Sequence, residues 1–134
     1  MTTAVPMIDD AAASAEVKAV FDDIKQTRDT DYINNFWRVL ASDPATLKRI
    51  WGDLKEVMAP GALDPLTKEM IYLAVSITNG CAYCSHSHGA AAKGRGMTKE
   101  MFAELMAIVG MANQTNKLAD GYRVPVDERF ENLF

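Results

Sequence analysis

The sequence predicts an all-α fold. Apolar residues recur at helical spacing in nearly every segment, and no stretch of four or more positions alternates strictly between apolar and polar residues. Helix start and stop signals divide the chain into about six segments. The length of 134 residues, with 49% hydrophobic and 24% charged residues, suits one globular domain. We therefore expect a single-domain bundle of about six helices over residues 1–134, with irregular tails at 1–12 and 122–134.

Three helices are expected in the first half of the chain. A first amphipathic helix spans about residues 14–26, and a short second helix lies near 36–40. The third begins at Asp43-Pro44, because Asp can cap free N–H groups while Pro occupies the first helical position without losing a bond. The face of the first helix consists of residues at positions i, i+3, i+4 and i+7, namely Val17, Val20, Phe21 and Ile24.

The second half begins with the same start signal. Asp64-Pro65 opens a helix that runs through Thr78, where Asn79-Gly80 ends it in the manner of a C-cap. Residues 70–77 carry no charge and are apolar all round, which is typical of a helix buried in a core. We therefore expect this helix to lie at the centre of the fold.

Two more helices follow it. The chain is helical again from Cys81 to about Lys93, and Gly94-Arg95-Gly96 interrupts it. Thr98 is the expected N-cap of the sixth helix. The tail after Gly121 contains a proline and several charges, so we expect it to be irregular.

The charge pattern excludes several classes of partner. The net charge is −4, the pI is near 5.1 and the basic residues are scattered, whereas nucleic-acid binders cluster Lys and Arg. The longest uncharged run, residues 70–85, is shorter than a membrane span, and the N-terminus lacks the features of a signal peptide. These observations predict a cytoplasmic protein without nucleic-acid or membrane partners. The small size and eight Met residues favour a homo-oligomer.

The chemistry of the sequence is concentrated in a Cys-x-x-Cys motif. A loop this short removes little unfolded-state entropy when it is closed by a disulfide, so Cys81 and Cys84 serve chemistry or metal binding. On a helix that begins at Cys81, the two thiols and His88 share an arc of about 60 degrees, while His86 points away. The helix N-terminus favours a thiolate, and an imidazole one turn after Cys84 can exchange a proton with it.

Glu69 is the fourth candidate residue. It lies at the edge of the uncharged run, where burial would favour a role as proton acceptor. The alternative is a surface Glu in the first turn, which is stabilised by the helix dipole. Both readings stay open from the local pattern.

A zinc site is a second interpretation of the motif. Cys81, Cys84, His88 and His86 are suitable zinc ligands by residue type. They crowd one helix, however, whereas structural zinc sites usually combine two separated pairs. We therefore expect no bound metal.

The motif resembles a known signature. Glu69, eleven residues, Cys81-Ala82-Tyr83-Cys84, three residues and His88 match the spacing of the AhpD-like (alkylhydroperoxidase D-like) branch of the carboxymuconolactone decarboxylase family. The matching block covers about residues 65–97. Asn35-Phe36-Trp37-Arg38 is similar to the shorter peroxidase-related members.

This resemblance implies an all-helical protomer that assembles, often as trimers or hexamers, and reduces hydroperoxides without a cofactor. It implies that Cys84 attacks, that Cys81 resolves the resulting sulfenic acid, and that His88 with Glu69 relays protons. The alkylhydroperoxidase D proteins of this branch have a His where this chain has Tyr83, so their fuller proton network is incomplete here. Their lipoyl partner is not carried over, and the electron donor, a dithiol or a protein, is unknown.

These observations favour a thiol-dependent peroxidase or disulfide oxidoreductase. One alternative is a non-enzymatic, redox-sensing helical oligomer, and another is the zinc-binding module. Turnover distinguishes an enzyme from a sensor, because an enzyme consumes peroxide over many cycles and a sensor is oxidised once. Metal analysis of the purified protein distinguishes the zinc module.

Overall fold

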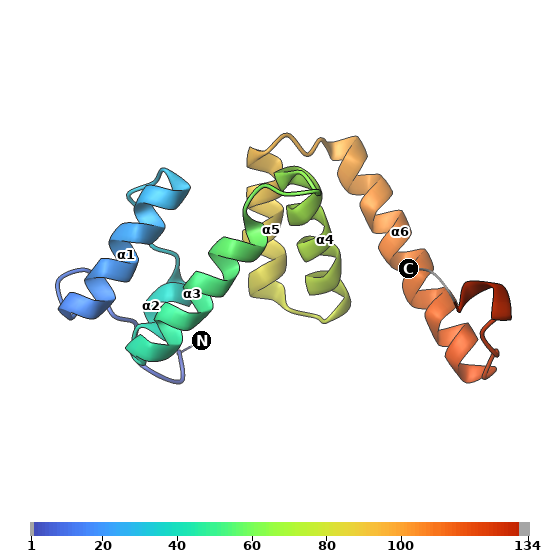
Figure 1. Cartoon of the computed structure of the whole chain (residues 1–134), viewed down its shortest axis with the longest axis horizontal. Coiled ribbons are helices and arrows are strands. Elements are labelled where there is room, and N and C mark those ends of the chain that lie inside the picture. Colours follow the sequence, from blue (N-terminus) through green and yellow to red (C-terminus); the bar gives the residue numbers. More distant parts are fainter. Residues whose placement is uncertain (1, 132–134) are drawn as a thin grey trace. The chain divides into compact units, whose positions relative to one another are not determined.

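The computed structural model describes residues 2–131, and this part of the chain is helical without strands (Figure 1). The all-α prediction is confirmed. The elements are α1 (Ala15–Arg28), α2 (Asn35–Leu40), α3 (Pro44–Met58), α4 (Pro65–Thr78), α5 (Ala82–Gly94), α6 (Lys99–Gly121) and a short 3-10 helix, η1 (Glu128–Phe130).

The N-terminal caps account for where four of these helices begin. Ser14, Asp43, Asp64 and Thr98 have extended backbones, and the side chain of each accepts a hydrogen bond from the backbone N–H three residues later. The shortest of these bonds joins the Thr67 N–H to Asp64 at 2.9 Å. Such caps satisfy N–H groups that have no partner inside the helix, which is why the helices begin where the sequence predicts.

The end of α1 and the C-terminal tail differ from the sequence prediction. Helix α1 continues to Arg28, beyond the expected end at Gln26, and stops where Asp29 adopts a left-handed conformation with φ of 50°. The tail after Gly121 contains η1, whereas we expected it to be irregular throughout. Both differences are local, and neither alters the order of the elements.

The chain divides into two compact units, one ending at Ala59 and the other beginning at Pro60. The first unit holds α1, α2 and α3 around an aromatic core. Trp37 and Trp51 meet edge to face with ring centroids 5.3 Å apart, and the indole N–H of Trp51 donates to Asp23 at 2.6 Å. The buried residues of this core are Val17, Val20, Phe21, Ile24, Ile33, Trp37, Ala41, Leu47 and Trp51.

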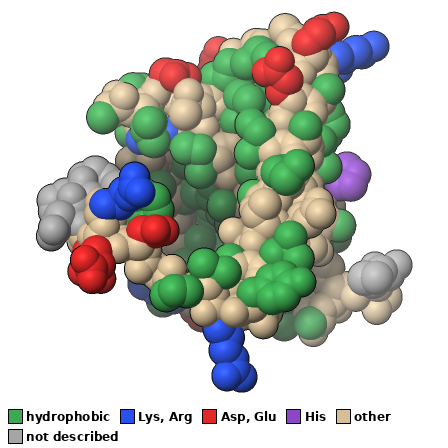
Figure 2. Space-filling view, turned by 90° about the vertical axis from the view of Figure 1, so that its right-hand side faces the viewer, with side chains coloured by type: hydrophobic (Ala, Val, Ile, Leu, Met, Phe, Trp, Pro, Cys, Tyr) green, Lys and Arg blue, Asp and Glu red, His purple; other side chains and the backbone are tan. Residues whose placement is uncertain are grey.

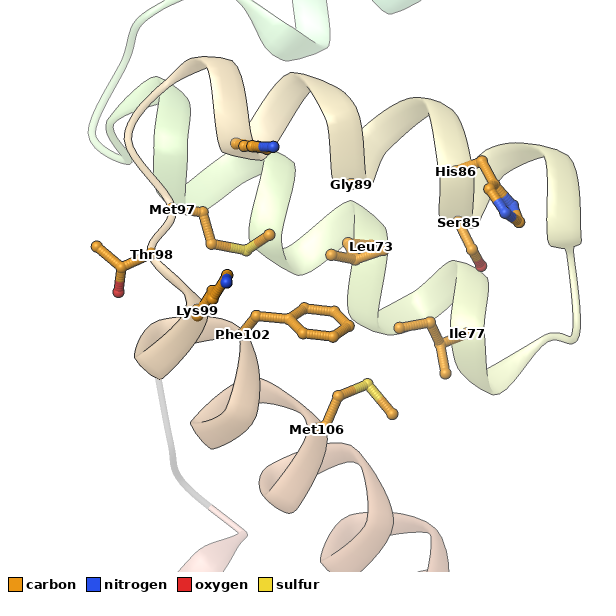
Figure 3. Close-up of a pocket in the computed structure, with 11 residues that line it drawn as sticks. Leu73, Ile77, Ser85, His86, Gly89, Met97, Thr98, Lys99, Phe102 and Met106 are labelled. Atoms are coloured by element: carbon orange, nitrogen blue, oxygen red, sulfur yellow. The ribbon is translucent and has the colours of Figure 1, made fainter.

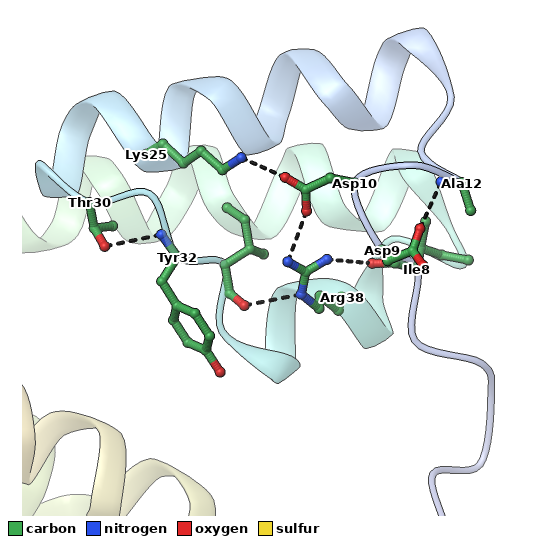
Figure 4. A network of polar contacts seen from close by, with 9 residues as sticks. Ile8, Asp9, Asp10, Ala12, Lys25, Thr30, Tyr32 and Arg38 are labelled. Carbon is green, nitrogen blue, oxygen red and sulfur yellow. Dashed lines mark hydrogen bonds and ion pairs between the residues drawn. The ribbon is translucent and has the colours of Figure 1, made fainter.

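Arg38 anchors the N-terminal segment to this first unit (Figure 4). Its guanidinium donates to the carbonyls of Ile8 and Ile33, each at 3.2 Å, and pairs with Asp10 at 2.8 Å. Asp10 also pairs with Lys25 of α1 at 2.6 Å. The segment before α1 is therefore fixed by charged hydrogen bonds to two helices.

The second unit contains the α4–α5 pair and α6. Helices α4 and α5 lie side by side in Figure 1, and α6 packs on α4. Leu73, Leu105 and Val109 form its buried core, with Met70, Ala74, Ile77 and Met97 packed against them. Helix α4 is thus the element on which both neighbouring helices rest.

The prediction that residues 70–77 are buried on all sides is wrong for the single chain. Leu73 and Ser76 face the core, but Ile71 and Val75 are about half exposed, at 49% and 53%. The neighbouring helices cover only part of the circumference of α4, so the remaining apolar side chains reach the surface. A continuous apolar run predicts burial against some partner without specifying which one.

Helix α6 is also apolar on an exposed side. Ile108 and Met111 are 68% and 60% exposed, and the space-filling view shows hydrophobic side chains at the surface (Figure 2). Although α6 has 23 residues, no helix within residues 2–131 is both long and apolar enough to cross a membrane.

Candidate functional site

The tight connection between α4 and α5 places Cys81 at the start of α5. Gly80 has a φ of 70°, a conformation that L side chains rarely adopt, and the N–H of Cys81 donates back to the carbonyl of Ser76 at 2.9 Å. The chain therefore leaves α4 and enters α5 within a few residues. Cys81 occupies the N-cap position of α5 with an extended backbone.

Both cysteines are free thiols and partly buried. The backbone N–H of Cys84 lies 3.4 Å from the sulfur of Cys81, which takes the place of a capping oxygen. The hydrogen bond from this N–H, followed by the hydrogen bond with the Cys84 side chain, lowers the pKa of the Cys81 thiol below its ordinary value. The helix N-terminus thus stabilises a thiolate at Cys81.

The pKa of the Cys84 thiol shifts in the opposite direction. Burial raises the pKa of its thiol to about 11, and the hydrogen bond and charge of the neighbouring Cys81 contribute to the same shift. Two adjacent thiols do not both ionise readily, because the first negative charge opposes the second. Of the two thiols, Cys81 is therefore the one that ionises more readily, and Cys84 is the one that holds its proton more firmly.

Glu69 and His88 form a close pair across the α4–α5 interface. The Nδ1 atom of His88 lies 2.7 Å from Oε2 of Glu69, and their side chains are only 12% and 8% exposed. An ionised carboxylate can only accept hydrogen bonds, so it holds the proton of the neutral imidazole on Nδ1 and leaves Nε2 as an acceptor. Glu69 is buried, so of the two alternatives that the sequence left open the surface position is excluded.

Arg95 adds a second positive group to this pair. Its Nε atom lies 3.7 Å from Oε1 of Glu69, on the side away from the His88 contact, and its side chain is about half exposed. Arg95 is the C-cap residue of α5, where its N–H donates to carbonyls of the last turn. One carboxylate is therefore shared between a buried imidazole and a half-exposed guanidinium.

An aromatic ring covers one face of His88. The rings of Tyr72 and His88 are stacked, with centroids 3.6 Å apart and an interplanar angle of 21°. Burial raises the pKa of the Tyr72 phenol, and the negative charges of the two cysteines and Glu69 raise it further. The phenol therefore stays protonated beside the thiols.

The structure brings Glu69 and His88 into contact and places Cys84 one turn before His88 on α5, with Cys81 at the N-cap of the same helix. His86 is exposed and its Nδ1 contacts the carbonyl of Ala82 at 2.7 Å, so it points away from the pair as expected. Sequence reasoning missed two neighbours of the pair, Tyr72 and Arg95. Tyr72 follows Glu69 by three residues on α4, and this helical spacing was an available signal.

An apolar groove of about 610 Å³ lies between the α4–α5 pair and α6 (Figure 3). The ring of Phe102 and the side chain of Met106 point from α6 toward Leu73 and Ile77 of α4. His86 lies at one end of the groove, and neither cysteine is among its lining residues. The groove is thus separate from the thiol pair.

The acidic, His and Cys side chains do not gather into a metal site in the described part of the chain. No group of three or more of them within residues 2–131 has an arrangement that could hold a metal ion. The Glu69–His88 pair and the cysteine pair are each engaged in contacts of their own.

Comparison with known proteins identifies the family of this chain. A sequence model of the carboxymuconolactone decarboxylase family matches residues 44–127, which include all four predicted site residues. An uncharacterised protein of Cupriavidus necator is 31% identical over 83 residues, which cover 62% of this chain and 74% of that protein.

A solved structure extends the likeness to nearly the whole chain. The crystal structure of an alkylhydroperoxidase AhpD core from Rhodospirillum rubrum is 56% identical in sequence, with a TM-score of 0.93. The match covers 97% of this chain and 98% of that one. Because the family model covers more than half of its residues and the fold agrees along almost its full length, this chain belongs to the carboxymuconolactone decarboxylase family, in its AhpD-like branch.

Proposed function

We propose that this protein is a thiol-dependent peroxidase that reduces hydroperoxides with Cys84 and Cys81. The observation that carries the proposal is the buried Glu69–His88 pair, with Nδ1 and Oε2 2.7 Å apart, because His88 lies on α5, the helix that contains Cys84 and is capped by Cys81. A proton-transferring pair beside a dithiol is what peroxide reduction requires. The likeness to the Rhodospirillum rubrum alkylhydroperoxidase core supports the same reaction class.

In the first step, the sulfur of Cys84 attacks the terminal oxygen of the hydroperoxide. The O–O bond breaks, Cys84 becomes a sulfenic acid, and the leaving alkoxide takes a proton and departs as an alcohol. Since burial and the neighbouring Cys81 hold the pKa of Cys84 near about 11, this thiol needs a proton acceptor. We assign that role to Nε2 of His88, with Glu69 stabilising the imidazolium that forms.

In the second step, Cys81 attacks the sulfenic acid. A disulfide forms between Cys81 and Cys84, and the hydroxyl of the sulfenic acid takes a proton and leaves as water. The low pKa of Cys81 favours this attack, because a thiolate is the nucleophile. An external dithiol then reduces the disulfide and is itself oxidised, which closes the cycle.

The test is a steady-state assay of the reduced protein with hydrogen peroxide and several organic hydroperoxides, each combined with different dithiol donors. An enzyme consumes many equivalents of peroxide per chain, whereas a redox sensor stops after one. The control is Cys84→Ser, which keeps the fold and removes the attacking sulfur. If wild-type protein stops at one equivalent with every donor, the protein is a sensor and the peroxidase proposal is wrong.

A further inference from the structure

We propose that Tyr72 is a positioning residue that fixes the plane of the His88 imidazole, so that Nδ1 stays bonded to Glu69 and Nε2 stays free to accept a proton. The proposal rests on the proposed function, because it assigns His88 the role of proton acceptor. It adds a residue of α4 that lies outside the Cys-x-x-Cys, His and Glu set.

The hydrogen bond to Glu69 alone does not orient the imidazole. It holds one atom, Nδ1, at 2.7 Å from the carboxylate, and rotation of the ring about its Cβ–Cγ bond would break this single contact. Such a rotation would release Nδ1 from Glu69 and move Nε2, so that either nitrogen could carry the proton. A second contact, made with the face of the ring, is needed to stop it.

Tyr72 supplies this contact. Its ring lies 3.6 Å from the imidazole centroid at an angle of 21°, so any large rotation of His88 would drive the two rings into each other. Aromatic pairs usually prefer offset or edge-to-face arrangements with centroids about 4.5–7 Å apart. The stack is closer than that range, and it joins α4 to α5, two helices that pack against each other.

The two contacts on His88 come from the same face of α4. Glu69 and Tyr72 are three residues apart, which places them next to each other on the helix surface. Glu69 holds the Nδ1 edge of the imidazole, and Tyr72 covers its face. The imidazole contacts Glu69 and Tyr72 from α4, Arg95 contacts the same Glu69, and the charges of Cys81 and Cys84 act on the Tyr72 phenol.

The test compares Tyr72→Phe, which keeps the ring, with Tyr72→Leu, which removes it. The chain has only two histidines, so nitrogen NMR of protein with labelled His resolves the ring of His88 once His86→Gln has identified the other signals. Wild type and Tyr72→Phe should show one tautomer, protonated on Nδ1. Tyr72→Leu should show averaged nitrogen shifts, and its peroxide turnover should fall at least about tenfold while Tyr72→Phe stays within about threefold.

The matched control is Tyr83→Leu, the same substitution at the tyrosine next to Cys84, which should leave the His88 tautomer unchanged. If Tyr72→Leu does not fold, Tyr72→Met fills a similar volume without a flat face and replaces it in the comparison. The proposal is overturned if wild-type His88 already exchanges between tautomers, or if Tyr72→Leu keeps the wild-type spectrum. It is also overturned if Tyr72→Phe loses as much activity as Tyr72→Leu, because the hydroxyl would then be the working group.

The NMR measurement uses the resting, reduced protein and needs no substrate. A wild-type protein with a single fixed tautomer but no turnover would contradict the peroxidase proposal and leave the positioning of His88 by Tyr72 intact. The opposite result, turnover with a freely exchanging imidazole, would contradict only the role of Tyr72.

Discussion

The backbone N–H of Cys84 donates to the sulfur of Cys81 across 3.4 Å, so the first thiol of the motif caps the helix that carries the second. The two thiols are chemically identical side chains, but they have different pKa values in this structure. The contact lowers the pKa of Cys81, whereas burial, followed by the hydrogen bond and the charge of Cys81, raises the pKa of Cys84. The resemblance to the family implies attack by Cys84, so the attacking thiol is the one that must first lose a proton.

Replacing Cys81 should make Cys84 easier to ionise. Cys81→Ala removes the neighbouring sulfur and its charge and leaves only burial to raise the pKa of Cys84, so this pKa should fall below its value of about 11. The measurement is the pH dependence of alkylation at Cys84, whose midpoint should move to lower pH. In the control, Cys84→Ala, Cys81 should keep a depressed pKa, because its main cause is a backbone N–H that the substitution retains. A midpoint that stays in place or rises would contradict the assigned cause.

The two cysteines should give different products with peroxide. Cys84→Ser should abolish peroxide consumption, whereas Cys81→Ser should undergo one oxidation and accumulate a sulfenic acid on Cys84. Trapping with a dione reagent followed by peptide mass spectrometry identifies the oxidised sulfur. A sulfenic acid trapped on Cys81 in the Cys84→Ser variant would reverse the roles, in agreement with the low pKa of Cys81.

Glu69→Gln should reduce peroxide turnover at least about tenfold, because general acid–base groups typically contribute about 10²- to 10⁴-fold. The substitution keeps the shape of the side chain and removes the negative charge that stabilises a protonated His88. The melting temperature should change little, since the amide can still hydrogen-bond to Nδ1. The control is Glu104→Gln, at an exposed position of α6. Turnover of Glu69→Gln within about twofold of wild type would remove Glu69 from the relay and leave His88 as the only base.

The exposed apolar side of α6 should be covered by other copies of the chain. Ile108 is 68% exposed, and the apolar residues Ile71 and Val75 of α4 are also about half exposed. We expect a homo-oligomer, as trimers or hexamers, in light scattering at micromolar concentration. Ile108→Glu should dissociate it, because burying an unpaired carboxylate in an apolar contact is costly. Lys117→Glu, at a polar position of α6, serves as the control, and a wild-type monomer would contradict the prediction.

The fold was predictable where the signals are local. Asp43-Pro44 and Asp64-Pro65 mark helix starts within a few residues, since a cap depends only on the side chain and the next turn. The pairing of Glu69 with His88 was anticipated from the resemblance to the family signature, although the contact spans 19 residues. That spacing has a physical basis, because the short turn at Gly80 fixes how α4 and α5 align.

Other features depend on packing that a sequence pattern does not specify. The stack of Tyr72 on His88 requires the separation and rotation of α4 relative to α5, and neither follows from helical periodicity. The unequal pKa values of the two cysteines depend on the exact N-cap geometry of Cys81. The exposure of Ile71 was mispredicted because an apolar run has the same composition whether it faces its own core or a partner.

The position of Cys81 at the N-cap links the redox state of the protein to the order of its own helix. A sulfur that is bonded to another sulfur carries no negative charge, so an oxidised Cys81 is a weaker acceptor for the N–H of Cys84. Loss of an N-cap typically destabilises a helix by about 0.5–2 kcal/mol. The first turn of α5 should therefore exchange its amide hydrogens faster in the disulfide form than in the dithiol form. The coupling is reciprocal: because the turn is more stable in the dithiol form, any interaction that stabilises this turn favours that form. Such an interaction therefore makes the disulfide easier to reduce.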